Sequence, residues 1–164
     1  MVDGNSWDES RSGGNGRGSR GADGYAGDAS YTSGASGASS RDVIFDRVPP
    51  HDDDAEMAVL GGMLMSKDAI GEVSQMIDVT DFYQPKHQTI YEAIITLFSG
   101  SQPVDVVLVA NELLKAGDLE KVGGADYLHS LVASVPTAAN ATFYAEIVHQ
   151  RAILRNVIAT GTKI

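Results

Sequence analysis

The chain has 164 residues, contains no cysteine and carries a formal net charge of −10 at pH 7. This length fits one domain with appendages, and the lack of thiols excludes disulfides and thiolate metal sites. Because an acidic chain repels phosphate backbones, a protein that grips DNA or RNA by itself is disfavoured. No apolar run approaches the roughly 18 residues of a membrane span, and the start, MVDGNSWDES, lacks the pattern of a signal peptide. We therefore expect a soluble, cytoplasmic protein with no membrane association.

Residues 1–44 are rich in glycine and serine and poor in branched aliphatic residues. Such a segment cannot bury enough apolar surface to offset its ordering entropy, so we expect a disordered tail. Within it, GRGSRG (16–21) matches the dinucleotide fingerprint G-x-G-x-x-G. That fingerprint requires a strand before it and a helix after it, whereas both flanks here are glycine and serine. We assign no function to the motif or to the tail.

The folded part is predicted to begin at residue 45, and the acidic run HDDD (51–54) precedes its first helix. This run could be a metal site or a helix start. Asp52 and Asp53 stand before apolar residues at helical spacing, and an aspartate carboxylate accepts from the free N–H groups of a first turn. Consecutive residues point around the helix axis instead of converging on an ion, which favours the helix start. Gly61-Gly62 inside this helix costs about 1 kcal/mol per glycine relative to alanine, which predicts a closely packed neighbouring helix.

Four more head helices follow from their caps, breakers and apolar spacing. The predicted helices cover 67–76, 85–99, 105–116 and 125–134. The residues that begin or end them are Ser66, Pro85, Gly100, Asp105, Gly117 and Pro136. The β-branched stretch 104–109 would also suit a strand, but the Asp105 cap and the spacing through Leu114 favour a helix.

From Ala138 to the end of the chain, no proline interrupts the helical pattern, and Thr137 can cap it. This helix would have about 25 residues and a length of roughly 37 Å, which is more than the small head needs. A wide apolar face on an overlong helix indicates a partner. Because the pattern has no clear stop at Ile164, we expect a truncated element.

No catalytic or metal-binding constellation is found in the sequence. The four histidines, His51, His87, His129 and His149, are not paired at metal-ligand spacing, and no P-loop or G-x-S-x-G pattern occurs. His87 follows Pro85 in a first helical turn, so we expect a structural contact with Tyr83 or with a carboxylate. The fragment is therefore predicted to be neither an enzyme nor a cofactor-binding protein.

Four stretches, in order, resemble the N-terminal domain of the DnaB family of bacterial replicative DNA helicases. They are AEMAVLGGMLMSKDAI (55–70), DFYQPKHQTIYEAI (81–94), GGADYLHSLVASVPTAANATFYAEIV (123–148) and RAILRNVI (151–158). VPTAAN followed by a helix with an aromatic pair is the most specific part. The resemblance implies an all-α fold, with a bundle of five to six helices at 45–136 and a long helix at 137–164 that begins a helical hairpin. The family's linker and ATPase domain would follow.

The resemblance implies a non-catalytic collar within a parent protein that unwinds duplex DNA at the replication fork. ATP and Mg²⁺ would bind to the C-terminal domain that this chain lacks, and DNA would be contacted only through that motor. The expected partners are further copies, as dimers within a hexamer, DnaG primase and a helicase loader. In the family the long helix supplies much of the collar packing, so its apolar side is the expected oligomer face. The predicted face comprises Phe143, Tyr144, Ile147, Val148, Arg151, Leu154 and Ile158.

Two alternatives stay open at the level of the sequence. One is a free-standing helical adaptor that shares only the fold. The other is a nucleic-acid-binding domain of helix-turn-helix type, which would need a recognition helix with surface arginine and lysine. The only basic cluster that could serve it is Arg151, Arg155 and Lys163.

Overall fold

A computed structural model describes residues 48–163, and the predictions for the tail and for its glycine motif lie outside this range. Every regular element of the described part is helical, which confirms the all-α fold. The α-helices are α2 (Asp53–Met65), α3 (Lys67–Val73), α4 (Pro85–Ser99), α5 (Val106–Ala116), α6 (Gly124–Ala133) and α7 (Ala141–Gly161), with 3-10 turns η1 (Val79–Asp81) and η2 (Ala138–Asn140). Among them, none combines the length and apolarity needed to cross a bilayer.

The predicted caps explain where two of the head helices begin. The Asp52 carboxylate accepts from the backbone N–H of Ala55 at 3.0 Å, so the acidic run is a helix start, as predicted. The Asp105 carboxylate accepts from the backbone N–H of Leu108 at 2.8 Å. The stretch that could have been a strand is therefore the first part of α5.

Two predicted helix boundaries are wrong by about one turn. α3 ends at Val73, because residues 74–76 tighten into a turn with hydrogen bonds between residues three apart. The long helix begins at Ala141 and has 21 residues. The segment before it, 138–140, is the 3-10 turn η2, and Thr137 caps this turn instead of the α-helix.

Helix α2 is the centre of the head and packs against α3, α4, α6 and α7. Its glycine pair permits two of these contacts. A Cβ on Gly61 would lie 2.3 Å from the carbonyl oxygen of Leu131 in α6, and one on Gly62 would lie 2.9 Å from the Cβ of Ala141 in α7. The close approach that was predicted to compensate the two glycines is confirmed.

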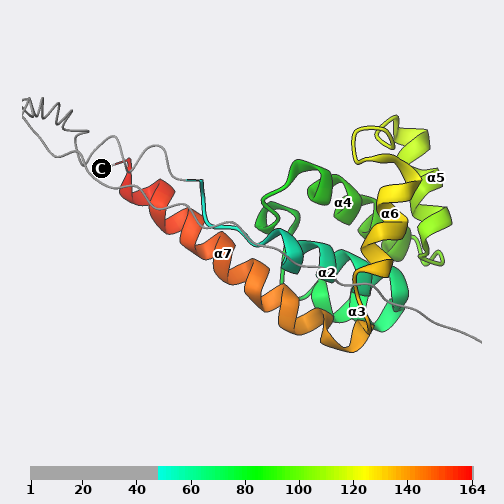
Figure 1. The fold of residues 1–164 in the computed structure, drawn as a ribbon, viewed down its shortest axis with the longest axis horizontal. Coiled ribbons are helices and arrows are strands. Elements are labelled where there is room, and N and C mark those ends of the chain that lie inside the picture. The colour runs from blue at the N-terminus through cyan, green and yellow to red at the C-terminus, as the bar shows by residue number, and fades with distance from the viewer. Residues whose placement is uncertain (1–47, 164) are drawn as a thin grey trace, which may run out of the picture.

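Helix α7 runs along one side of the head and continues beyond it, and α5 lies at the opposite end of the head (Figure 1). The buried residues of α7 recur every three to four positions along one side. They are Ala141, Ala145, Val148 and Ala152. Three of the four are alanines, so the helix lies close to α2 and α3 with little side-chain volume between them.

Candidate protein-interaction site

The side of α7 that faces away from the head carries large apolar residues, which we call the outer stripe. Its members are Phe143, Ile147, Leu154, Val157 and Ile158. At 100° per residue Phe143, Leu154 and Val157 lie opposite the alanines that contact the head, whereas Ile158 and the partly buried Ile147 stand at the edge of the stripe. Phe143 is 67% exposed, Val157 62%, Ile158 50% and Leu154 44%. An exposed apolar strip of this length is typical of a surface that another protein covers.

The outer stripe has the spacing of a coiled-coil seam. Phe143, Ile147, Leu154 and Val157 occupy alternating positions of a heptad, and Gln150 fills the one seam position between Ile147 and Leu154. A polar residue at a single seam position commonly fixes the register of two packed helices. The stripe is therefore suited to pair with another helix along its length.

The structure separates the seven residues of the predicted oligomer face. Phe143, Arg151, Leu154 and Ile158 are exposed, whereas Tyr144 and Ile147 are partly buried and pack against the core. Val148 is 1% exposed and packs the head, so it does not belong to the outer surface. Val157 is absent from the predicted face, although it is one of the most exposed members of the outer stripe. The binding role of this face remains a prediction.

A shallow groove of about 360 Å³ lies between the start of α2, the end of α6 and α7. Met57, Ala58, Tyr144 and Ile147 supply its apolar lining, and carboxylates of the α2 start lie at the same groove. Ile147 belongs to both the groove and the outer stripe. A partner helix on the stripe would therefore also meet an acidic border.

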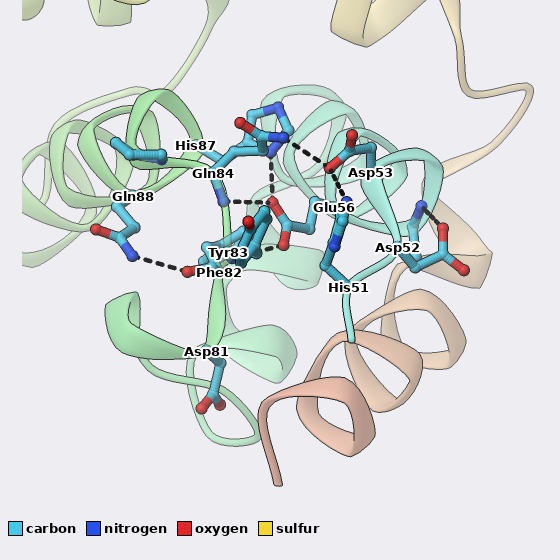
Figure 2. A network of polar contacts seen from close by, with 12 residues as sticks. His51, Asp52, Asp53, Glu56, Asp81, Phe82, Tyr83, Gln84, His87 and Gln88 are labelled. Carbon is cyan, nitrogen blue, oxygen red and sulfur yellow. Dashed lines mark hydrogen bonds and ion pairs between the residues drawn. The ribbon is translucent and has the colours of Figure 1, made fainter. Parts of the chain in front are cut away.

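A buried polar network lies inside the head, and sequence reasoning found only one of its members. Glu56 and His87 are each 1% exposed, and their side chains meet at 2.6 Å between Oε2 and Nδ1 (Figure 2). The Glu56 carboxylate also accepts from the backbone N–H groups of Tyr83, at 2.6 Å, and Gln84, at 3.3 Å. The other ring nitrogen of His87 lies 2.7 Å from the Tyr127 hydroxyl.

This network explains His87 as a structural residue, since the predicted contact with a carboxylate is present. A carboxylate can only accept, so Nδ1 carries the hydrogen and Nε2 can accept from the Tyr127 hydroxyl. No buried side-chain nitrogen or oxygen within 48–163 lacks a hydrogen-bond partner. The residues of this range also form no group of three or more metal-ligating side chains. The network therefore ties α2, α4 and α6 together.

Residues 48–150 match the family model of the DnaB-like helicase N-terminal domain. This chain belongs to that family. Among curated relatives, the replicative DNA helicase DnaB of Leifsonia xyli is 52% identical over 119 residues and that of Mycobacterium leprae 51% over 120, each across 73% of this chain. The replicative DNA helicase DnaC of Bacillus subtilis is 44% identical over 123 residues, across 75% of the chain. The matched parts are 26%, 20% and 27% of those relatives, so the DnaB-like chain spans about a quarter of their length.

Solved structures agree with the DnaB-like fold. The N-terminal domain of DnaB helicase from Mycobacterium tuberculosis superimposes with a TM-score of 0.70 at 51% identity, over 71% of this chain and 84% of that one. The N-terminal domain of DnaB helicase from Helicobacter pylori, solved in a study that includes its interactions with primase, gives a TM-score of 0.56 at 21% identity, over 67% and 85%. The second likeness supports the fold alone.

The basic cluster of this DnaB-like domain is smaller than the sequence suggested. Arg155 is partly buried, and its guanidinium donates to two main-chain carbonyl groups. Arg151 and Lys163 remain exposed on α7 and just beyond its end. A helix-turn-helix domain needs a recognition helix with exposed basic residues. Because Arg155 is engaged with the head, the structure favours this alternative less than the sequence does.

Proposed function

We propose that this DnaB-like domain is the collar of a hexameric replicative DNA helicase and serves assembly and primase recruitment. The parent protein would unwind duplex DNA at the replication fork in the cytoplasm, with ATP and Mg²⁺ in a C-terminal domain. The outer stripe of α7 is the observation that carries the assembly role, because it is apolar, exposed and spaced as a helix-pairing seam.

The outer stripe can supply the free energy that assembly needs. Complete burial of one large apolar side chain contributes about 1.5–3 kcal/mol. Phe143, Leu154, Val157 and Ile158 are each 44% exposed or more, so each would gain part of that amount under a partner helix. Glu146 and Arg151 flank the seam with opposite charges, at positions where coiled coils select their partners. We infer that the partner is a helix of the same protein, either from a second copy or from the parent chain.

Primase is the external partner that the family supports best. The Helicobacter pylori DnaB N-terminal domain is described together with its interactions with primase, and we extend that class of partner to this domain. The net charge of −10 suits a protein scaffold better than a direct DNA clamp, because acidic side chains repel the phosphate backbone.

Sedimentation of the full-length parent protein tests the assembly role. We expect Phe143→Asp with Leu154→Asp to shift the parent toward smaller species, because two charges in the seam cannot be buried unpaired. The matched control is Val107→Asp with Leu114→Asp on α5, where two exposed apolar residues lie away from the stripe. If the α7 variant sediments like the wild type, or if both variants dissociate alike, the stripe is not the assembly surface.

Two further measurements separate the collar from a free-standing adaptor. An antibody against residues 47–135 should detect a band much heavier than 17.3 kDa in lysate of the source cells. A band near that mass would contradict the helicase role. Purified fragment should show no ATP hydrolysis above a buffer blank, since the motor is expected in another domain, and turnover would overturn the non-catalytic role.

A further inference from the structure

Arg155 is the last residue of α7 that is partly buried, and every residue from Asn156 to Lys163 is exposed. One guanidinium nitrogen, Nη1, donates to the carbonyl of Pro50 at 2.9 Å. The other, Nη2, donates to the carbonyl of Asp81 at 2.5 Å. A single side chain therefore joins the projecting end of α7 to two segments of the head that are far apart in sequence.

The chemistry of this site requires arginine. The planar guanidinium presents two diverging N–H groups, so it can bridge two carbonyl oxygens at once, whereas a lysine ammonium acts as one compact charge. The guanidinium carbon also lies 5.6 Å from the centre of the Tyr83 ring, and His51 stacks on that ring at 4.1 Å between centroids. Two carbonyl groups and an aromatic ring thus surround the cation.

A second residue of α7 holds the same turn. Nδ1 of His149 lies 3.0 Å from Oδ2 of Asp81, and this oxygen also accepts from the backbone N–H of Asp78 at 3.2 Å. Asp81 is therefore fastened to α7 by its side chain through His149 and by its main chain through Arg155. The turn η1 is fixed to the helix at two points.

The apolar contact between α7 and the head ends at Ala152, before the position of Arg155. Ala145, Val148 and Ala152 give α7 a smooth surface toward the head, and the last buried position is Ala152. Alanine side chains are short, so this side of α7 places little side-chain volume against the head, and beyond Ala152 only Arg155 is not exposed. The groups that fix the direction beyond Ala152 are those of Arg155.

We propose that Arg155 is a latch that sets the angle at which the exposed end of α7 leaves the head. When the guanidinium releases the carbonyl groups of Pro50 and Asp81, the continuous helix α7 tilts on its alanine side, and its exposed end changes direction. The inference rests on these contacts alone and does not depend on the proposed collar role. Its consequence is that the direction of a projecting helix can change without any change in the core of the head.

Spin-label distances in the full 164-residue chain test the latch, and the absence of native cysteine makes the labelling clean. Nitroxides are attached at His129→Cys in α6 and Thr160→Cys in α7, both at exposed positions. Labelled chain is mixed with excess unlabelled chain of the same variant, so that distances between copies do not contribute. The compared chains are the wild type, Arg155→Leu, Arg155→Lys and the control Arg151→Leu, which alters an exposed arginine one turn earlier.

We expect one narrow distance distribution for the wild type and for Arg151→Leu. Arg155→Leu should give a broadened and shifted distribution with unchanged helical circular dichroism. Arg155→Lys should broaden it too, because a single ammonium nitrogen cannot occupy the positions of both Nη1 and Nη2. Wild-type distributions for both Arg155 variants would overturn the latch. Loss of helical structure in both would also overturn it, because Arg155 would then stabilise the fold of the head instead of the direction of α7.

Discussion

Gly61 of α2 lies so close to Leu131 of α6 that a Cβ on the glycine would stand 2.3 Å from the leucine carbonyl oxygen. The Val135 side chain would be only 2.7 Å away, so both neighbours would have to move. Main-chain atoms of a packed helix cannot yield as the end of a flexible side chain can. This pair of residues sets the distance between two helices of the head.

We expect Gly61→Ala to lower the free energy of unfolding by about 2 kcal/mol, since over-packing costs about 1–3 kcal/mol. Gly71→Ala is the matched control, because a Cβ there meets only the Phe98 ring at an ordinary 3.8 Å. In that control the free energy of unfolding should rise by up to about 1 kcal/mol, because alanine has the higher helix propensity. Urea unfolding followed by circular dichroism measures both. Equal effects of the two substitutions would contradict the close-contact explanation.

Glu56→Gln tests the buried network while it keeps the shape of the side chain. The amide has one acceptor oxygen fewer and turns an NH₂ group toward donors. We therefore expect the free energy of unfolding to fall by about 3 kcal/mol. Asp54→Asn makes the same chemical change at an exposed position of the same helix and should cost little. Thermal and urea unfolding provide the measurement. A stability of Glu56→Gln like that of Asp54→Asn would mean that the carboxylate charge is not needed.

Tyr91 makes the free energy of unfolding depend on pH in the alkaline range. Burial raises the pKa of its phenol above 10.0, and the neighbouring carboxylates of Asp78 and Asp81 raise this pKa further. Its hydroxyl donates to the carbonyl of Ile77 at 2.8 Å, and an ionised oxygen could not do so. Above pH 10.0 the unfolded chain releases this proton while the folded chain retains it, so folding stability falls as the pH rises.

Tyr91→Phe should remove this contribution. We expect the variant to be less stable at neutral pH by about 1 kcal/mol, the value of one hydrogen bond. Between about pH 9 and about pH 11 its stability should fall less steeply than that of the wild type. Urea midpoints at several pH values compare the two slopes. Parallel slopes would show that Tyr91 ionises equally in the folded and unfolded chains.

Asp105 is a cap whose contribution can be isolated. Replacement by alanine removes the acceptor of the Leu108 N–H and should cost about 1 kcal/mol. Replacement by asparagine keeps a capping oxygen and should retain most of the stability. Unfolding midpoints that are equally low for both variants would assign the effect to the negative charge and not to the hydrogen bond.

Local features of the fold could be predicted from the sequence because they depend on neighbouring residues. Asp52 and Asp105 cap helices through hydrogen bonds that span three positions, and the glycine pair of α2 pointed to a close neighbour. Glu56 was missed because it stands in an acidic first turn, where charges usually face solvent. Its spacing to Val59, Leu60 and Met63 places it on the buried side, and that pattern could have identified it.

The long-range contacts could not be predicted in the same way. Arg155 meets Pro50 and Asp81, which are 105 and 74 residues away in the sequence. The predicted oligomer face combined residues from two sides of α7, because Val148 is apolar and was grouped with Phe143. The actual head contact consists mostly of alanines, which give a weak hydrophobic pattern, so the side that faces the head was hard to identify from the sequence.

The alanine side of α7 affects how the sequence of this domain can change in evolution. Alanine has no side-chain rotamer freedom to lose, so the joint between α7 and the head forms at little entropic cost. Phe143, Leu154 and Val157 of the outer stripe lie across the width of the helix from that joint, and substitutions at separated positions act nearly independently. A lineage could therefore exchange the residues that choose a partner while the joint stays unaltered. Partner choice and the stability of the domain can evolve on separate sides of one helix.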